Sequence, residues 1–385
     1  MAVTSDPTGH PSSTAALDSA AEVDALARAT TLDPGWYGDA DHHRQELGAV
    51  FRAGWSCVGV IDDVAQGGWM AAHAGDVPVV VTRSAAGELK AFLNACRHRG
   101  APVADGCGTG RVLRCPYHAW SYRLDGSLAT SHGMEGAADF DPEDFGLLEV
   151  GVAKWSRFVF VCPVAEPPAF DLGPLAAAID PYATQDLELA QRKTTERAFN
   201  WKLLLENYSE NFHTPWVHPQ LTWQQWEYPI VADGPVVLAW DRPLAPQGPV
   251  EEALAHATPM DEGWRRVADT QIDEVFLAGA YFAVFPNLLV SMFPRYLSAF
   301  WLSPVAVDRT AVSYVRMWHP EVDDARRAAD LEASEEVAAQ DLDICEALQR
   351  TASAGIDPRG RLSPQHENGV FHLHELVRRA LAGTR

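Results

Sequence analysis

Asn207–Tyr208–Ser209–Glu210–Asn211–Phe212–His213–Thr214–Pro215–Trp216–Val217–His218 is the stretch that decides how the second half of this chain is interpreted. Its two histidines are five positions apart, about 140° around an ideal helix, so a regular helix could not aim both at one ion. Pro215 lies between them, removes a backbone donor and disrupts the helical turn. We therefore predict a distorted helix end that turns both imidazoles inward. Two imidazoles need one more carboxylate to hold Fe(II) and leave positions open for dioxygen.

The residues before this stretch predict a helix. Asn200–Glu206 combines a helix start with an apolar turn, and Glu206, Glu210 and His213 follow at i, i+4 and i+7. That spacing would place the three side chains on one helix face. The alternative interpretation is that His213 and His218 are unrelated members of a tryptophan-rich core.

Length, composition and charge limit the classes of function. The chain has 385 residues, of which 47% are hydrophobic, which is enough for two domains with real cores. A net charge of −22 makes nucleic acid and anionic membrane poor partners, and it could favour docking to a basic protein. No apolar run is long enough to span a bilayer, and the N-terminus shows no secretory signal. We expect a cytoplasmic protein.

The first half of the chain predicts a small antiparallel β domain. Residues 1–20 are rich in Ser, Thr, Pro and Ala and are expected to be disordered, with helices at 21–29 and 41–55. Short β-type runs then alternate with Gly, Pro, Asp and Asn, at 77–81, 90–94, 111–114, 119–123 and 158–161. We predict an N-terminal segment 1–45 that packs on the second domain, a β domain 46–163, and a second domain 164–385.

The second half mixes strands and helices. Candidate strands lie at 279–285, 288–292, 297–302 and 310–318, followed by a long helix at 322–351. Ser363 could cap a last helix with Pro364 in its first position. The order predicts an α+β domain in which an antiparallel sheet wraps round a helix.

Two Cys and two His residues form a metal signature in the β domain. Cys96–Arg97–His98 and Cys115–Pro116–Tyr117–His118 are separated by sixteen residues, and each group follows a predicted strand. Two thiolates on one iron and two imidazoles on the other are the ligands of a Rieske-type [2Fe–2S] cluster. The same ligand set could bind a structural zinc, although zinc modules more often use C-x2-C pairs. Cys57 and Cys162 are predicted core residues, and Cys107 is left out of the site.

At this point the chain resembles a known family. The C-x-H group followed by C-P-Y-H-A-W-S-Y resembles the Rieske domain of Rieske non-haem iron oxygenases, and N-W-K-L-L-L-E-N-Y-S-E-N-F-H-T-P-W-V-H resembles their mononuclear-iron motif. The resemblance extends from about Trp36 to the C-terminus. It implies a small all-β Rieske domain and a helix-grip (START-like) catalytic domain. It also implies the terminal oxygenase (alpha) component, which uses dioxygen, a small-molecule substrate and electrons from a reductase or ferredoxin.

In this family a third iron ligand comes from an Asp on a late helix, and the candidates here are Asp341 and Asp343. Helical spacing places Asp341 on one stripe with Val337, Ile344, Cys345 and Leu348, so that it interrupts an apolar face. Asp343 shares a polar side of the helix. A carboxylate on an apolar face needs a partner, and an iron is a suitable one, so we select Asp341 together with His213 and His218. The alternative is that the carboxylate pairs with a buried Arg.

The resemblance further implies that an acidic residue before the first His connects the mononuclear site to a Rieske His of a neighbouring subunit. Glu210 occupies that place, with His98 or His118 of the next chain as its partner, which implies a homotrimer. Asn207 could form a hydrogen bond near the iron. Glu at this position resembles the branch that acts on carnitine, glycine betaine, choline and stachydrine. Phe212 and Thr214 depart from the Tyr and Cys that are common in that branch, which weakens the substrate assignment.

The substrate pocket and the rival functions remain open at the level of sequence. Strand aromatics could line the pocket or simply fill the core: Tyr281, Phe282, Phe285, Phe293, Phe300 and Trp301. An aromatic cage for a quaternary ammonium group could come from Trp216, Trp223, Trp226 and Tyr228. Hydroxylation or N-dealkylation of an amine competes with aromatic-ring hydroxylation. The rivals from other classes are a Rieske electron carrier without oxygenase activity and a zinc-stabilised binding protein.

Overall fold

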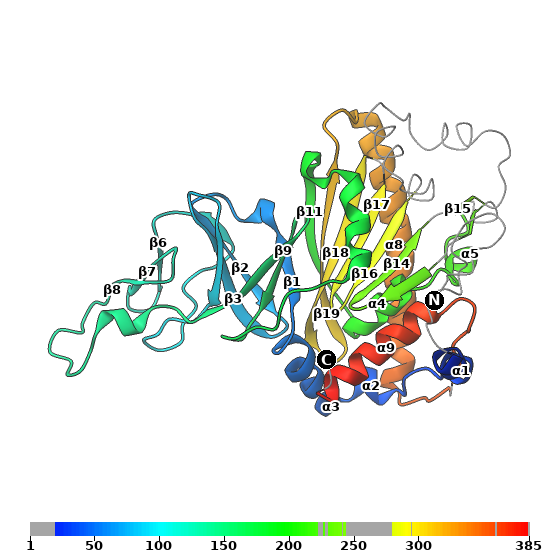
Figure 1. The fold of residues 1–385 in the computed structure, drawn as a ribbon, viewed down its shortest axis with the longest axis horizontal. Coiled ribbons are helices and arrows are strands. Elements are labelled where there is room, and N and C mark those ends of the chain that lie inside the picture. The colour runs from blue at the N-terminus through cyan, green and yellow to red at the C-terminus, as the bar shows by residue number, and fades with distance from the viewer. Residues whose placement is uncertain are drawn as a thin grey trace. The chain divides into compact units, whose positions relative to one another are not determined.

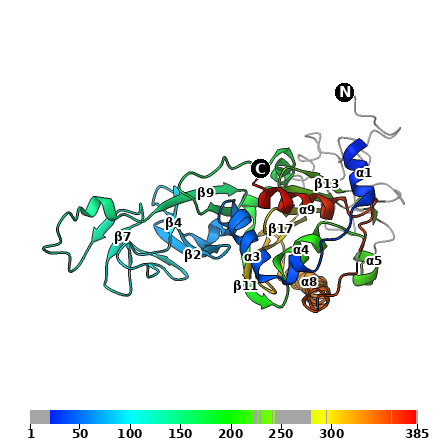
Figure 2. The same cartoon turned by 90° about the horizontal axis from the view of Figure 1, so that it is seen from below.

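The chain forms two compact units. The computed structural model describes residues 20–221, 226–227, 230–240, 242–243, 279–293, 295–358 and 360–383. One unit is Arg44–Asp171, and the other combines the residues up to His43 with Leu172–Arg385 (Figures 1 and 2). The disorder predicted for residues 1–20 falls almost entirely outside the described residues.

The unit Arg44–Asp171 is built from antiparallel strands. Its larger sheet has seven strands in the order β1-β10-β9-β4-β3-β2-β5. The strands are β1 (Ser56–Val60), β2 (Gly68–Ala74), β3 (Val77–Arg83), β4 (Leu89–Leu93), β5 (Cys107–Thr109), β9 (Glu149–Trp155) and β10 (Phe158–Cys162). A second, three-stranded sheet joins β6 (Val112–Arg114), β7 (Ser121–Arg123) and β8 (Leu128–Thr130).

Alternation along the strands gives this unit two apolar cores. Val79 and Val81 of β3 pack into one cluster, whereas Val80, between them, packs into the other, because successive side chains of a strand point to opposite faces. The second core contains Cys96 and Cys115 themselves. Both candidate cluster cysteines are therefore held by packed side chains rather than by a surface loop alone.

The second unit contains a seven-stranded antiparallel sheet with helical segments packed against it (Figures 1 and 2). The strand order is β11-β19-β18-β17-β16-β14-β13. The strands are β11 (Glu188–Arg197), β13 (Ile230–Asp233), β14 (Val236–Trp240), β16 (Ala280–Val284), β17 (Leu288–Phe293), β18 (Tyr296–Ala306) and β19 (Arg309–Trp318). The helices are α1 (Ala20–Arg28), α2 (Gly35–Gly38), α4 (Trp201–Tyr208), α5 (Thr214–Val217), α8 (Asp324–Ser353) and α9 (Asn368–Leu381). A short pair, β12 (Trp226–Glu227) and β15 (Arg242–Pro243), lies outside the main sheet.

Asn200 fixes the start of α4 on the sheet. Its side-chain oxygen accepts from the Lys202 backbone N–H at 3.1 Å, its amide donates to the Val307 carbonyl at 2.7 Å, and its own backbone N–H donates to Gln349 Oε1 at 2.8 Å. The cap thus links α4 to α8 and to the turn between β18 and β19, and α4 contacts α8, α9, β17 and β18. At the other end of α4, Gly369 of α9 lies so close to the Ser209 carbonyl that no Cβ would fit.

Several sequence expectations are corrected at element ends. The helix predicted at 41–55 is split into α3 (Ala40–Glu46) and a π-helical turn, Leu47–Phe51. The strand predicted from Ala119 begins at Ser121, because Ala119 has a positive φ of 63° in the preceding turn. The polar edge strand β11 was not predicted, since its alternation carries little apolar signal.

The predicted cap of the last helix is wrong. Ser363 and Pro364 precede a turn that is not continued, and α9 begins only at Asn368. The Glu367 carboxylate instead accepts from the Ser363 backbone N–H at 2.5 Å. The helix therefore begins about one turn later than the sequence predicts.

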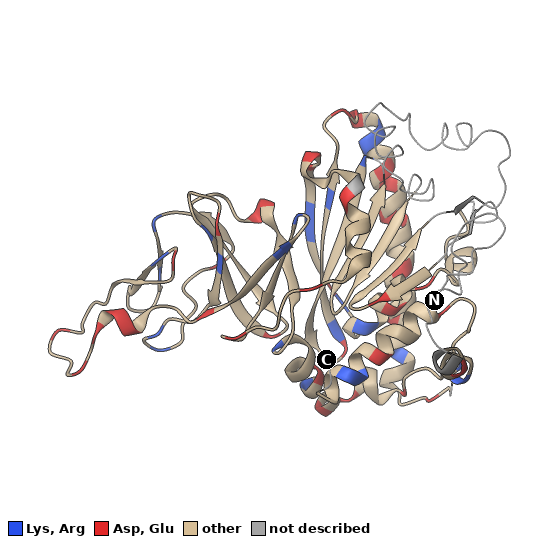
Figure 3. Cartoon of the chain, in the orientation of Figure 1, with Lys and Arg blue, Asp and Glu red and all other residues tan. Residues whose placement is uncertain are grey.

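Acidic positions outnumber basic ones over both units (Figure 3). Among the described helices, none combines the length and apolar character needed to cross a membrane.

Candidate functional site

The two histidines of the iron motif flank a single helical turn. α4 ends at Tyr208, and the chain bends before α5, where Thr214 and Pro215 occupy the first two positions. His213 precedes α5 and His218 follows it. The predicted disruption of the turn at Pro215 is wrong, because Pro215 lies in the first turn of α5, where no intrahelical N–H bond is lost, and the helix breaks earlier, after Tyr208. The two imidazoles nevertheless face one point, as predicted. The predicted common helix face of Glu206, Glu210 and His213 is wrong, because the helix ends before Glu210.

His213, His218 and Asp341 converge on one point. Nε2 of His218 lies 3.0 Å from Asp341 Oδ1, and Nε2 of His213 lies 3.4 Å from the same oxygen. The three potential ligand atoms lie within 4.8 Å of one another. Asp341 Oδ1 is buried and makes no hydrogen bond of acceptable geometry, although two ring nitrogens face it. A buried carboxylate oxygen in that position fits a metal ligand better than a hydrogen-bond acceptor, and the donor set suits Fe(II).

The other ring nitrogen of each histidine has its own acceptor. Nδ1 of His213 lies 2.5 Å from Glu210 Oε1, and Nδ1 of His218 lies 2.7 Å from Gln340 Oε1. A proton on each Nδ1 leaves each Nε2 lone pair free for a metal. Glu210 also accepts from the backbone N–H groups of Phe212 and His213. Sequence reasoning missed Gln340, and its position one residue before Asp341 was the available signal.

Charges around the triad shift the pKa values of its members. Burial lowers the pKa of His213, but the Asp341 and Glu210 carboxylates outweigh it and raise the pKa to about 9. Burial likewise opposes the rise in the pKa of His218 that Asp341 causes. The pKa of Asp341 is raised by burial and lowered more strongly by the two imidazoles, so it lies below its ordinary value. Without a metal, the triad is held together by charge.

The apolar side of α8 that favours Asp341 over Asp343 is only partly buried. Cys345 is buried on that side of α8, but Ile344 and Leu348 are exposed, so the assumed apolar face is narrower than predicted. Asp343 is 76% exposed in its side chain and pairs with Arg197 at 3.0 Å. Asp341 has a side-chain exposure of 17% and faces the histidines.

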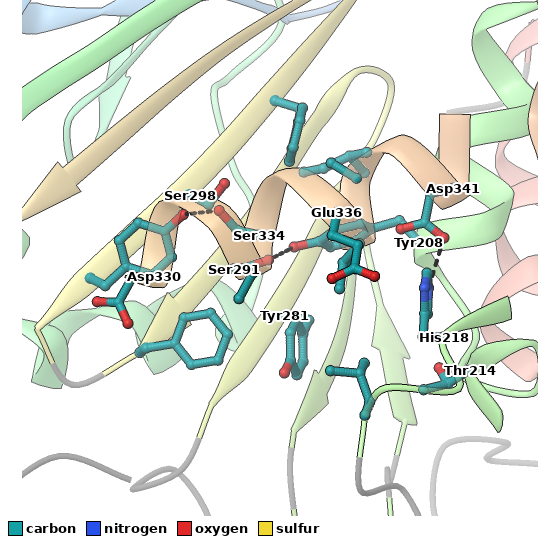
Figure 4. Close-up of a pocket in the computed structure, with 18 of the residues that line it drawn as sticks. Tyr208, Thr214, His218, Tyr281, Ser291, Ser298, Asp330, Ser334, Glu336 and Asp341 are labelled. Carbon is teal, nitrogen blue, oxygen red and sulfur yellow. Dashed lines mark hydrogen bonds and ion pairs between the residues drawn. The ribbon is translucent and has the colours of Figure 1, made fainter. Parts of the chain in front are cut away.

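The triad lies in the wall of a pocket of about 520 Å³ (Figure 4). Asn207 and Glu210 also line it, as do three of the six predicted aromatics, Tyr281, Phe293 and Phe300. The other three, Phe282, Phe285 and Trp301, do not line it. Tyr208 and Ser291 also line the pocket, and the Tyr208 hydroxyl lies 2.5 Å from Ser291 Oγ.

The predicted aromatic cage is not supported by the residues that can be assessed. Trp216 is 79% exposed and does not line the pocket. Trp223 and Tyr228 lie outside the described residues, and the side chain of Trp226 is not described.

The candidate cluster ligands lie on two similar loops. The first follows β4 and the second follows β6, and in each the residue four after the cysteine donates its N–H to the cysteine carbonyl, at 2.8 Å for Gly100 and 3.1 Å for Ala119. Both of these residues have positive φ, 77° and 63°. Cys96 and Cys115 are buried, whereas His98 and His118 are exposed with ring centroids 4.7 Å apart. Buried thiols beneath exposed imidazoles fit a cluster that exchanges electrons at the protein surface.

Tyr122 contacts one of the candidate cluster cysteines, and the cysteines outside the two loops are not part of the site. The Tyr122 hydroxyl lies 3.2 Å from Cys96 Sγ and accepts from the Arg97 N–H at 2.9 Å. Cys57 and Cys162 are fully buried, and Cys107 is exposed on β5.

Comparison with known proteins matches both halves of the chain to families. Residues 54–141 match the Rieske [2Fe–2S] domain, and residues 184–383 match the ring hydroxylating alpha subunit (catalytic domain). The glycine betaine monooxygenase oxygenase subunit of Pseudomonas aeruginosa is 34% identical over 207 residues, which is 53% of this chain and 48% of the relative. The chain thus spans about half the length of that curated relative. The chloroplastic choline monooxygenase of Arabidopsis thaliana is 25% identical over 91% of this chain and 83% of its own.

Solved structures share the fold. The quaternary ammonium Rieske monooxygenase CntA in complex with L-carnitine matches with a TM-score of 0.76 at 22% identity, over 93% of this chain and 97% of that one. Naphthalene 1,2-dioxygenase from Rhodococcus sp. matches with a TM-score of 0.78 at 18% identity, over 94% and 97%. The predicted α+β fold, a Rieske domain plus a catalytic domain with an antiparallel sheet, is confirmed.

Proposed function

Because this chain belongs to the ring-hydroxylating alpha subunit family of Rieske non-haem iron oxygenases, we propose that it is the terminal oxygenase component of such a system. It uses dioxygen and electrons from a reductase or ferredoxin to oxidise a small molecule. The observation that carries this proposal is the convergence of His213, His218 and Asp341, within 4.8 Å, on the wall of a 520 Å³ pocket.

Each metal group has its own set of residues. Cys96, His98, Cys115 and His118 hold the [2Fe–2S] cluster, and His213, His218 and Asp341 hold the mononuclear iron. When bound, the cluster supplies electrons one at a time and the iron supplies a site for dioxygen next to the substrate. The protein's part is positioning. Glu210 and Gln340 orient the two imidazoles through their Nδ1 atoms, and the pocket holds the substrate beside the triad.

Glu210 would connect the residues that hold the cluster to those that hold the mononuclear iron. Its carboxylate already contacts the His213 ring, so one end of the connection is built within this chain. We propose that the other end is His98 or His118 of a neighbouring subunit in a homotrimer. We place the protein in the cytoplasm, and we retain 1–45, 46–163 and 164–385 as the N-terminal segment, Rieske domain and catalytic domain.

The substrate class follows from the relatives. Glycine betaine and choline monooxygenases are among them, and a CntA structure contains L-carnitine, so we propose hydroxylation or oxidative N-dealkylation of a quaternary ammonium compound. Aromatic-ring hydroxylation has less support, because the sequence relatives of 30% identity or more include glycine betaine and carnitine monooxygenase oxygenase subunits, whereas naphthalene 1,2-dioxygenase and CntA share only the fold.

Iron content and product formation test the proposal together. Iron-replete protein should contain about three irons per chain, and with a surrogate reductase it should oxidise at least one member of a panel of betaines, choline and aromatic acids. About two irons per chain without product would identify an electron carrier, and a colourless sample with zinc would identify a binding protein.

A further inference from the structure

The pocket has a polar end opposite the iron ligands. Figure 4 shows Ser298 and Ser334 at one end and Asp341 and His218 at the other. Ser334 and Asp341 are seven positions apart on α8. Seven residues of helix correspond to about 10 Å, so this end lies roughly that far from the triad. Tyr296 also belongs to it, with its hydroxyl donating to Ser334 Oγ at 3.1 Å.

Ser298 places a hydroxyl in the lining of this end of the pocket. The residue is only 5% exposed and lines the pocket, and none of the described residues forms a hydrogen bond with its side chain. It lies on the same face of β18 as Tyr296 and Phe300, which also line the pocket. A hydroxyl that faces a cavity and has no protein partner among the described residues can donate a hydrogen bond to a molecule bound there, so Ser298 points to a polar ligand group.

Behind these hydroxyls lies a buried positive charge. Arg316 of β19 pairs directly with Ser298 in the sheet and is 1% exposed. Its Nε donates to Tyr296 OH at 2.9 Å and to Ser334 Oγ at 3.0 Å, and its NH1 donates to Gln191 Oε1 at 2.8 Å. All three acceptors are neutral. No described carboxylate lies within ion-pair distance of this guanidinium.

Two arginines line the pocket itself, Arg295 and Arg326, and each has a carboxylate partner. Asp330, the partner of Arg326, also lines the pocket at this end (Figure 4). Arg326 Nε lies 2.7 Å from Asp330 Oδ1, and Arg295 NH1 lies 3.6 Å from Glu321 Oε2. Both are also more exposed than Arg316. Of these three arginines, Arg316 alone has no carboxylate partner among the described residues, and its guanidinium lies 4.7 Å from the centre of the Tyr314 ring. Because a buried charge is stabilised further by a counter-ion, an anionic ligand group near Arg316 would be favoured.

We propose that Ser298, Tyr296 and Ser334, backed by Arg316, form a binding site for an anionic group of the substrate. Arg316 already donates to the Tyr296 and Ser334 oxygens. The Tyr296 hydroxyl can therefore rotate and donate its hydrogen bond to a ligand oxygen instead of to Ser334, and the Ser298 hydroxyl can donate a second hydrogen bond to the ligand. This inference rests on the proposed function and narrows it. The substrate is a zwitterion whose carboxylate lies several bonds from the group oxidised at the iron, rather than a cationic alcohol such as choline.

Direct binding to the intact, iron-replete protein tests this site without any electron donor. The probes are γ-butyrobetaine and its carboxamide, which have the same length and the same ammonium group and differ in the anionic charge. Isothermal titration calorimetry should show the carboxylate binding at least roughly tenfold more tightly, since hydrogen bonds to charged groups are the stronger ones.

Two variants test whether Ser298 and Arg316 cause the preference for the carboxylate over the carboxamide. Ser298→Ala should lower the affinity for the carboxylate roughly tenfold and leave the carboxamide within about threefold. Arg316→Gln should lower it further and bring the ratio of the two affinities close to one. Ser313→Ala is the matched control, because Ser313 is a buried serine of β19 that bonds Thr194 and does not line the pocket. Circular dichroism checks folding, and if Arg316→Gln does not fold, Ser298→Ala decides.

Equal affinity for carboxylate and carboxamide in the unmodified protein would overturn the proposal, as would failure of the carboxylate to bind or a preference unchanged by both variants. Product formation is measured separately with a reductase. Tight, selective binding without any product would therefore count against the oxygenase function and leave the anion site standing, whereas rapid oxidation of choline with no preference for betaines would do the reverse.

Discussion

The loops that carry the cluster ligands and the triad that faces the pocket are assembled in opposite ways. Each cluster loop contributes a cysteine and a histidine from a few consecutive residues, and each is closed by the same backbone hydrogen bond. The triad instead joins the two ends of α5 to the middle of α8. A site built from local turns can be recognised from spacing, whereas a site built across the fold depends on how helices pack on the sheet.

The sharpest way to break this comparison is to remove Asp341. Asp341→Ala should lower the iron content from about three to about two per chain and abolish product formation, roughly a thousandfold or more, because two imidazoles alone hold Fe(II) poorly. The visible spectrum of the cluster should persist. Asp343→Ala is the control, since that exposed side chain faces Arg197 and not the histidines. Retention of the third iron in Asp341→Ala would refute the ligand assignment.

Glu210 tests whether the two regions communicate. Glu210→Gln keeps the size of the side chain and removes its charge, so both metals should remain bound while turnover falls roughly a hundredfold. Stopped-flow spectroscopy of the reduced cluster should show slower oxidation in the presence of substrate and dioxygen. Cluster oxidation at the original rate would exclude Glu210 from the electron route.

Gln340 tests how far the orientation of His218 matters. Gln340→Ala removes the acceptor 2.7 Å from His218 Nδ1 and should weaken iron binding roughly 10- to 100-fold. Gln340→Glu restores an acceptor and should recover most of the affinity, which separates orientation from packing. Competition with a chelator of known affinity measures both, and equal losses in the two variants would contradict the orienting role.

Acidity should weaken metal binding by the triad. In the metal-free protein the pKa of His213 is raised to about 9, so below that pH a metal must displace a proton. Affinity for Co(II), measured anaerobically, should therefore rise by up to about tenfold per pH unit between pH 7 and 9. The stability of the metal-free fold should instead fall as the pH rises. The raised pKa adds stability that is complete below the unfolded value and is lost as the pH rises through 9. Metal affinity independent of pH over this interval would contradict the assignment.

The smallest expected effect concerns the scaffold of the triad. Asn200→Ala removes the cap of α4 and its bond to the Val307 carbonyl, and it should reduce the free energy of unfolding by about 1–2 kcal/mol. Denaturant titration measures the loss. A change in stability below about 0.5 kcal/mol would show that packing, rather than the cap, positions α4.

The family, the α+β class and the residue types of both sites could be predicted from the chain alone. The spacing of Cys96, His98, Cys115 and His118 is local, and so is that of the two histidines on either side of Pro215. The structure places Asp341 beside both histidines, but the apolar stripe used to select it is only partly buried, because Ile344 and Leu348 are exposed. Periodicity records which side of a helix is apolar on average, not which residues the neighbouring elements cover.

What the sequence determined by itself was chemistry that is encoded within a few residues: thiols and imidazoles in two short loops, and two further imidazoles, His213 and His218, on either side of Pro215. What only the tertiary structure decided was which distant side chains meet. Gln340 meets His218, and Arg316 comes to lie behind Ser298 and Tyr296 because β19 and β18 pair in that register and α8 packs across them. Strand register and helix packing are collective outcomes of burying apolar surface, so no local pattern in the chain specifies them.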